Sequence, residues 1–138
     1  MKLTSVTYTS LAHINGSSEF EELETSSREW NARNDVTGFL VFNGIHFLQL
    51  IEGGEAIIDD LVERVRKDPR HTGFEIRDRQ KVERRSFPGS PLQVVRVNAS
   101  YFEARDAIAE RLPDTVSEGI RARLLRMTEL ISTIEFPS

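Results

Sequence analysis

The alternation of apolar and polar positions predicts that the chain opens with a strand and then a helix. Residues 3–10 alternate loosely and are rich in Thr, Val and Tyr, as in a strand. Turn residues follow at 15–18, and Ser18 with Glu21 three positions later predicts a capping box at the start of a helix. This helix carries one stripe that ends in polar residues and consists of Phe20, Leu23, Ser27, Trp30 and Asn31.

The strongest local signal is an almost continuous apolar segment from Val36 to Glu52, interrupted at Asn43-Gly44. Asn-Gly favours a two-residue hairpin turn, so the segment predicts two antiparallel strands. Apolar residues stand at both parities, and we therefore expect both faces of the hairpin to be covered. With Asn43 and Gly44 as the two turn residues, Gly38 would pair directly with Gln49.

A second helix and two further strands follow the hairpin. The helix begins after Gly53-Gly54, has a clean apolar stripe, and ends at Asp68-Pro69. Residues 74–86 and 91–98 then predict two strands. The order is βαββαβ with an additional fifth strand, which predicts an α+β, ferredoxin-like fold with both helices on one face of the sheet.

Two more helical stretches after Asn98 are separated by Leu112-Pro113-Asp114. The second has an apolar stripe that includes Val116, Ile120 and Leu124, and such a stripe needs a hydrophobic partner. We expect these helices to pack on the other face of the sheet, or on the same face of another subunit. The chain then divides into residues 1–98 and a C-terminal helical extension, 99–138, of the same compact unit.

Composition limits the functions that this fold could serve. The 138 residues suit one compact domain, without room for a separate output domain. The net charge of −4 does not favour nucleic acid or an anionic membrane as a partner. The absence of cysteine excludes thiolate catalysis and disulfides, so redox chemistry would need a bound cofactor. No apolar run approaches the ~20 residues of a membrane span, and the first residues lack the apolar core of a signal peptide, so we expect a cytoplasmic protein.

Some polar residues stand where chemistry could occur, and each also has a purely structural interpretation. Gln49 lies on an apolar strand face beside Gly38, so its amide bonds either a neighbouring side chain or water, or a ligand lying over Gly38. Tyr8 is ordinarily a packing residue with its hydroxyl at the rim. Asn31 ends the first helix, where asparagine usually serves a cap or a turn. None of these residues defines a site by itself.

The remaining candidates give weaker signals. Arg64 and Asp68 are four positions apart on the second helix and could form a surface ion pair. No glycine-rich phosphate loop is present. No metal site is predicted, because the histidines lack the spacing of metal ligands and are interpreted as solitary surface or partly packed residues: His13, His46 and His71.

Four segments, considered together, resemble the BLUF family of blue-light sensors that use flavin adenine dinucleotide (FAD). The resemblance covers residues 3 to 97, and Phe-Leu-Gln followed by an apolar pair and Glu-Gly is its most specific part. The segments are Tyr8-Thr9-Ser10, Asn31 with Val36-Thr37-Gly38-Phe39-Leu40, Phe47-Leu48-Gln49-Leu50-Ile51-Glu52-Gly53, and Arg64 with Asp68-Pro69-Arg70-His71.

The resemblance implies a pocket that binds FAD without a covalent bond, with the flavin ring between the first two helices above the sheet. Asn31, Arg64 and Asp68 would bond the polar edge of the ring. Leu23 and Ser27 would line the pocket from the first helix. On this interpretation residues 1–98 are the flavin-binding sensor domain.

The resemblance also implies a photochemical mechanism. Tyr8 would donate an electron and a proton to the excited flavin, and Gln49 would act as the relay and change its orientation or tautomer. Family members commonly place a Trp and a Met on the fifth strand, where this chain has Ser90 and Leu92. The only tryptophan is Trp30, so the route from Gln49 to the fifth strand is the part of the pattern that this chain departs from.

The leading interpretation is therefore a photoreceptor, not an enzyme, whose light state alters its interaction with a downstream signalling protein. The apolar face of the C-terminal helices also makes a homo-oligomer reasonable. The first alternative is a ferredoxin-like protein-interaction module that is not photoactive. A second alternative is a small enzyme, which would need a substrate opening or an anion-binding loop that the sequence does not show.

Overall fold

The computed structural model describes residues 2–14, 16–97 and 101–135. Among these residues no helix is long and apolar enough to cross a bilayer. The elements in chain order are β1 (Leu3–Ala12), α1 (Gly16–Arg33), β2 (Thr37–Phe42), β3 (His46–Gly53), α2 (Glu55–Lys67), β4 (His71–Val82), β5 (Gln93–Arg96), α3 (Tyr101–Arg111) and α4 (Glu118–Glu135).

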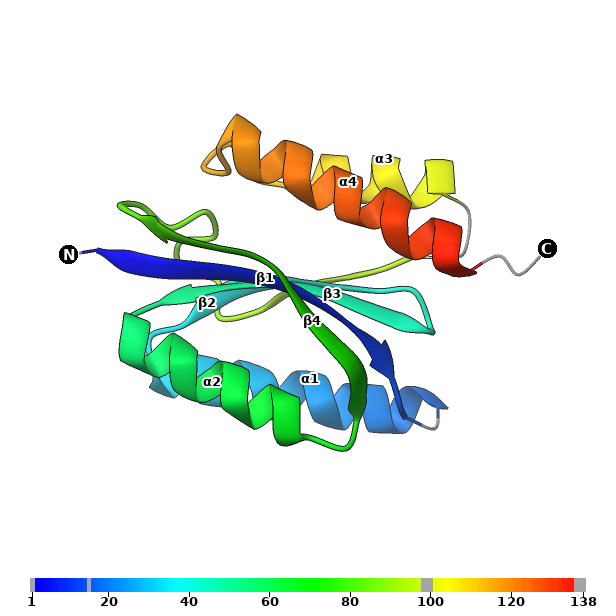
Figure 1. Ribbon diagram of the computed structural model, residues 1–138, viewed down its shortest axis with the longest axis horizontal. Coiled ribbons are helices and arrows are strands. Elements are labelled where there is room, and N and C mark those ends of the chain that lie inside the picture. The colour runs from blue at the N-terminus through cyan, green and yellow to red at the C-terminus, as the bar shows by residue number, and fades with distance from the viewer. Residues whose placement is uncertain (1, 15, 98–100, 136–138) are drawn as a thin grey trace.

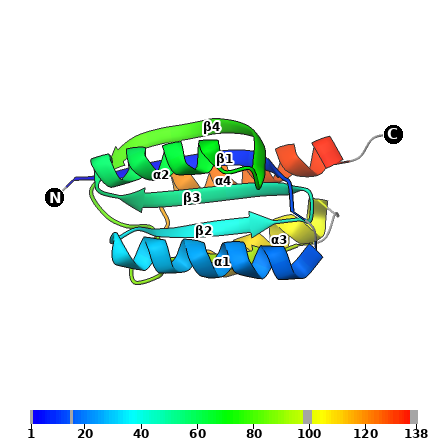
Figure 2. The same ribbon diagram turned by 90° about the horizontal axis from the view of Figure 1, so that it is seen from below.

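The strands form one five-stranded sheet in the order β4-β1-β3-β2-β5. β3 is antiparallel to β1 and β2, β4 is antiparallel to β1, and β5 is parallel to β2. Helices α1 and α2 cover one face and α3 and α4 cover the other (Figure 1). Seen from below, α1 lies towards β2 and α2 towards β4 (Figure 2). The predicted α+β, ferredoxin-like fold with a fifth strand and two C-terminal helices on the other face is confirmed.

Both faces of the β2–β3 hairpin are buried, as its continuous apolar pattern predicts. On the α3 and α4 side, strand residues such as Phe39 and Leu50 pack with Ile108, Ile120 and Leu124. On the α1 and α2 side, the buried residues form two separate clusters, one around Ile51 and Ile58 and the other around Phe20 and Phe47. The hairpin is therefore the central layer of the molecule.

The register of the hairpin differs from the prediction. Asn43 N–H donates to the His46 carbonyl at 3.3 Å, and Asn43 Oδ1 accepts from the backbone N–H groups of Ile45 and His46 at 2.9 and 2.6 Å. The central turn residues are therefore Gly44, with φ +95°, and Ile45. Leu40 lies opposite Gln49, and Gly38 lies opposite Ile51.

The predicted pairing of Gly38 with Gln49 is therefore wrong, because the side chain of Asn43 moves the turn by one residue. This change shifts the pairing by two residues, and an even shift leaves each side chain on its predicted face. Gly38 is required for a different reason: a Cβ at this position would lie 2.3 Å from the Leu50 carbonyl oxygen. The close approach of β2 to β3 at this point excludes a side chain.

The predicted helix start was also wrong. The chain enters α1 at Gly16, whose φ of +81° is a conformation that favours glycine. Ser18 consequently lies inside the first turn and cannot be the capping residue.

Strand β4 ends earlier, and strand β5 begins later, than the sequence predicts. β4 ends at Val82 and β5 begins at Gln93, so residues 83–92 form a connection. The backbone N–H groups of Ser86 and Phe87 donate to the carboxylate of Glu52 at 2.8 and 2.7 Å, and Pro91 has no N–H to donate. These donors are unavailable to the sheet, which is why both strands stop there.

Candidate functional site

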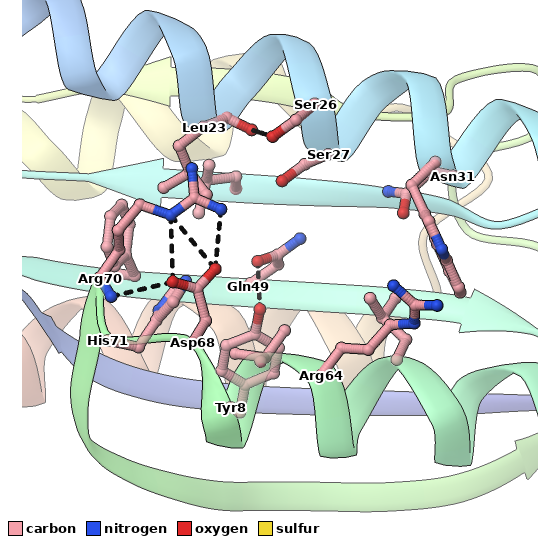
Figure 3. A pocket seen from close by; sticks show the side chains of 15 residues that line it. Tyr8, Leu23, Ser26, Ser27, Asn31, Gln49, Arg64, Asp68, Arg70 and His71 are labelled. Carbon is pink, nitrogen blue, oxygen red and sulfur yellow. Dashed lines mark hydrogen bonds and ion pairs between the residues drawn. The ribbon is translucent and has the colours of Figure 1, made fainter.

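An open pocket of about 240 Å³ lies between α1, α2 and the sheet. Figure 3 shows side chains from both helices and from β1 and β3 converging on it. Each residue proposed from the sequence lines this pocket: Tyr8, Leu23, Ser27, Asn31, Gln49, Arg64 and Asp68. The fold thus brings together residues separated by up to 60 positions in the chain, from Tyr8 to Asp68.

Tyr8 and Gln49 form the centre of the pocket floor. They lie directly opposite each other in the β1–β3 register, and the Tyr8 hydroxyl donates a hydrogen bond to Gln49 Oε1. Tyr8 is 1% exposed, and its ring packs against Phe74 with centroids 4.8 Å apart. Burial, with a smaller contribution from the charge of Asp68, raises the pKa of the Tyr8 phenol well above its usual value. Tyr8 is therefore a fixed proton donor at neutral pH.

The amide of Gln49 is only partly used by the protein. Its oxygen accepts from Tyr8, and its nitrogen points away from Tyr8 into the pocket (Figure 3). Within the part of the chain that the structure describes, no hydrogen bond joins this nitrogen to another group. A buried amide N–H is costly without an acceptor, so we expect a bound group in the pocket to accept a hydrogen bond from it.

Asn31 serves both the helix end and the pocket. Its backbone carbonyl accepts from the N–H groups of Asn34 and Val36 at 3.2 and 2.9 Å where α1 ends, a role open to any residue. Its side chain is buried and donates from Nδ2 to the Pro91 carbonyl at 2.8 Å. The side chain lies at the pocket wall formed by α1 (Figure 3).

Arg64 and Asp68 do not pair with each other, so the surface ion pair that their spacing allowed is not formed. Arg64 Nε contacts Asp60 at 3.3 Å, and its guanidinium lies 5.2 Å from the centroid of the Trp30 ring. Helix α2 ends at Lys67, and Asp68 has an extended backbone conformation. Asp68 therefore does not lie one helical turn beyond Arg64 on the same face of α2. Arg70 instead donates to Asp68 through Nε and Nη2 at 3.0 and 2.8 Å.

The electrostatics of Asp68 follow from this pairing. Burial by itself would raise the pKa of the Asp68 carboxyl, but the hydrogen bonds and positive charge of Arg70 outweigh burial and hold that pKa below its usual value. Asp68 is therefore an ionised acceptor at the pocket edge. Asp60 engages Arg64 through Nε, and within the described part of the chain the terminal nitrogens of Arg64 stay available for other partners.

His71 is a pocket residue that the spacing of the histidines does not reveal. It is buried, its Nδ1 lies 2.9 Å from Ser10 Oγ, and its ring is 4.8 Å from that of Phe47. Burial lowers the pKa of His71 to about 4, and the charge of Arg70 adds to this effect while Asp68 opposes it. His71 is therefore neutral at pH 7. The usable signal for it was its place in the Asp68-Pro69-Arg70-His71 segment.

The other histidines divide between the two expected environments. His13 is exposed, whereas His46 is buried, and burial lowers the pKa of His46. Among the described residues no group of His, Asp and Glu could hold a metal ion. Sequence reasoning also missed several wall residues of the pocket, namely Ser26, Trp30, Leu40, Phe47, Leu61, Val65 and Arg70. Leu61 and Val65 belong to the apolar stripe of the second helix, and the sequence pattern does not distinguish a residue that lines a pocket from one that packs in the core.

The residues present fit a flat ring system with an amide-like polar edge. Apolar walls enclose the space, while Gln49 and Asn31 contribute amide groups, Arg64 a cation and Asp68 an ionised acceptor. A few polar groups placed within an apolar pocket are typical of a site that binds and orients a small molecule. Donors and acceptors of this kind suit alternating carbonyl and N–H groups along one edge of a ring.

Comparison with known proteins identifies the class. Residues 3–93 match the family described as BLUF, sensors of blue-light using FAD, so the chain belongs to the BLUF family. This family consists of flavin-binding blue-light photoreceptors, which confirms the resemblance seen in the four sequence segments.

Particular relatives share the sequence or the fold. The blue light- and temperature-regulated antirepressor BluF of Escherichia coli (strain K12) is 42% identical over 53 residues, which are 38% of this chain and 13% of that protein. The chain thus matches only a small part of this relative's length. The structure of BlrB, a BLUF protein in its dark state, is 28% identical with a TM-score of 0.72, covering 96% of this chain and 97% of that one.

A second solved structure, the BLUF domain of BlrP1, is 26% identical with a TM-score of 0.77 and covers 97% of this chain and 90% of that one. The structure of Klebsiella pneumoniae BlrP1 with FMN and cyclic diGMP is 23% identical with a TM-score of 0.76. It covers 98% of this chain and 37% of that one, and at this identity it supports the fold alone.

Proposed function

We propose that this chain is a blue-light photoreceptor that binds FAD non-covalently in the pocket between α1 and α2. The observation that carries the proposal is the buried hydrogen bond from Tyr8 to Gln49, with the Gln49 amide nitrogen facing the pocket. The pocket volume of about 240 Å³ is smaller than the roughly 300–1,000 Å³ of sites that enclose a whole small molecule. It therefore suits the ring of FAD, with the rest of the cofactor at the open side.

The binding roles proposed here rest on the resemblance to the family and on the place of each side chain in the pocket lining. Asn31, Arg64 and Asp68 would bond the polar edge of the ring. Leu23 and Ser27 would line the α1 side of the pocket, across from the residues of α2. Every lining residue lies between Tyr8 and His71, which supports residues 1–98 as the sensor domain and 99–138 as a helical extension of it.

The switch would operate through Tyr8 and Gln49. When bound, FAD would supply the absorption of blue light and, in its excited state, an electron acceptor beside Tyr8. In the dark the Tyr8 proton stays on its oxygen, because burial raises the pKa of the phenol. Loss of an electron makes a phenol strongly acidic, so the Tyr8 proton would move along the existing hydrogen bond to Gln49 Oε1. No covalent bond to the protein is needed.

The amide of Gln49 would remain changed after the electron has returned. An amide protonated on oxygen could rotate, or could pass a nitrogen proton to an acceptor on the bound ring, and either change would exchange its donor and acceptor sides. Return of the electron from the ring, with one proton from the ring or from Gln49, would restore the Tyr8 phenol, and Gln49 would keep an altered pattern of hydrogen bonds. Such a local change can bias a structural element between two arrangements.

The output proposed is an altered interaction with a downstream signalling protein in the cytoplasm, by a chain that could also form a homo-oligomer. The net charge of −4 supports a protein partner over nucleic acid or a membrane. The chain would act as a sensor without an enzymatic reaction of its own.

The test is the absorption spectrum of the flavin-loaded protein before and after blue light. We expect a small reversible red shift in the wild type. Tyr8→Phe removes only the hydroxyl, so flavin should stay bound and the shift should disappear. Tyr101→Phe, at the chain's other tyrosine, is the control and should behave as the wild type. A flavin-loaded sample without a reversible shift would contradict the proposal and favour a non-photoactive interaction module.

A further inference from the structure

Two side chains of α1 hold the segment that leads into β5. Asn31 Nδ2 donates to the Pro91 carbonyl at 2.8 Å, and Arg28 Nη2 donates to the Leu92 carbonyl at 3.1 Å. The two donors stand three positions apart, which places them on the same face of the helix. Adjacent carbonyls held from one helix face fix both the position and the rotation of the segment.

Few other backbone hydrogen bonds hold this segment among the described residues. Pro91 has no N–H, and β5 is a four-residue edge strand that pairs only with β2. The Ser90 carbonyl accepts from Gly38 N–H at 3.1 Å, one residue before the two carbonyls that α1 holds. Gln93 Nε2 donates to the Arg111 carbonyl at 2.8 Å, so α1 holds the two residues just before β5 and α3 holds its first residue.

The same segment contacts the wall of the pocket. The side chain of Leu92 is 3% exposed and packs in one cluster with Leu23, Leu40 and Phe47, which line the pocket. Asn31 lines the pocket and donates to Pro91, whereas Arg28 donates to Leu92 without lining the pocket. Asn31 thus belongs to the pocket and to the support of β5 at once.

We infer that Arg28 and Asn31 are positioning residues that couple the pocket to β5 through the Leu92 and Pro91 carbonyls. This inference rests on the proposed function, since it names where the light-driven change leaves the pocket. A group that engages the rest of the Asn31 amide biases the orientation of Nδ2 and, with it, the position of Pro91. Arg28 keeps the neighbouring carbonyl in place, so that the bond from Asn31 to Pro91 is formed.

The test is amide hydrogen exchange of residues 93–97 in the full-length, FAD-loaded protein, in the dark and under blue light. Arg28→Met keeps the length of the side chain and removes its donors. We expect dark exchange of these amides to rise about fivefold, as for loss of one charge-assisted hydrogen bond at a partly exposed site. The difference between lit and dark exchange should shrink, while flavin content and the red shift remain.

Two matched variants separate this role from a general loss of structure. Glu24 pairs with Arg28 at 2.9 Å, so Glu24→Gln removes that ion pair and leaves the bond from Arg28 to Leu92. Its exchange should stay within about twofold of the wild type, because an ion pair between partly exposed side chains four positions apart on a helix contributes little. Arg28→Lys retains one charged donor and should restore much of the wild-type protection.

Each outcome decides a separate part of the inference. Wild-type dark exchange in Arg28→Met would overturn the role of Arg28 in holding β5. Raised dark exchange with an unchanged difference between lit and dark would overturn the coupling, as would a wild type whose red shift comes without any change at residues 93–97. Failure of the proposed function would look different: the wild type would lack the red shift, while the dark comparison still tests how β5 is held.

Discussion

The two faces of the sheet are built differently. On the α3 and α4 face, buried residues form one continuous cluster that runs from the strands through Ile108 and Leu124. On the α1 and α2 face, two clusters stand apart, and the pocket takes wall residues from both, Tyr8 from one and Phe47 from the other. A continuous core gives stability, whereas a divided core leaves space for a ligand.

The largest expected effect tests this difference with the same substitution on each face. Leu124 is fully buried in the continuous cluster, and Leu61 is half-buried at the pocket. Leu124→Ala should lower the free energy of unfolding by about 2–5 kcal/mol, since it leaves a cavity. Leu61→Ala should cost clearly less, because its neighbours already border open space. Urea unfolding of both variants measures this, and equal losses would contradict a divided core.

The second prediction concerns the pH dependence of stability on the pocket face. His71 has a pKa of about 4 in the folded protein against 6.5 when unperturbed, so the unfolded chain takes up this proton first as the pH falls. The stability associated with neutral His71 is complete above pH 6.5 and is lost between pH 6.5 and about 4, by up to about 3 kcal/mol.

Unfolding free energies measured across this pH range check the prediction. His71→Gln removes the titrating group while keeping a side chain that can bond Ser10, so its stability should fall less steeply than that of the wild type between these pH values. His13→Gln, at the exposed histidine, should follow the wild type. A His71 variant with the wild-type slope would show that burial does not hold His71 neutral.

The smallest effect compares two buried polar residues of β3. Glu52 is fully buried, faces the α3 and α4 side, and accepts from Thr37, Ser86 and Phe87. Glu52→Gln would set an amide N–H against one of these donors and should cost about 2 kcal/mol of unfolding free energy, with little effect on the absorption spectrum.

Gln49→Leu should give the opposite spectral result at a similar cost in stability. It leaves the buried Tyr8 hydroxyl without its acceptor, so it should cost about 1–3 kcal/mol of unfolding free energy. The light-induced shift should be lost, because the relay has gone. Denaturant unfolding and absorption spectra of the Glu52 and Gln49 variants give both quantities. A Gln49 variant that keeps the light-induced shift would show that Gln49 is not part of the switch.

The sequence was informative wherever periodicity decided the outcome. Apolar residues at both parities placed the hairpin between two layers, and Gln49 was assigned to the correct face. Its partner was not, because the turn depends on Asn43 Oδ1 accepting from Ile45 and His46, an interaction that periodicity does not encode. A register error of two residues leaves the face unchanged and alters every partner.

The pattern of apolar and polar residues could not predict contacts that depend on where a helix ends or on a backbone carbonyl. Arg64 and Asp68 have the spacing of an ion pair, yet α2 ends at Lys67 and Arg70 reaches the carboxylate first. The bond from Arg28 to the Leu92 carbonyl leaves no mark on the sequence, since every residue has a carbonyl. The resemblance to a family supplied what local rules did not, because it carries the spacing of distant segments.

The assignment of the two faces to different parts of the chain has a consequence for its synthesis. The pocket lining is complete once His71 has been made, but strand residues such as Leu50 are covered only by later residues up to Leu124. At a translation rate of about 5–20 residues per second, about 4–15 s pass between the synthesis of Leu50 and that of Leu124. During this time α3 and α4 do not yet cover the apolar face. The nascent chain is thus most prone to aggregate on the face opposite the pocket, and a chaperone that shields this protein should bind there first.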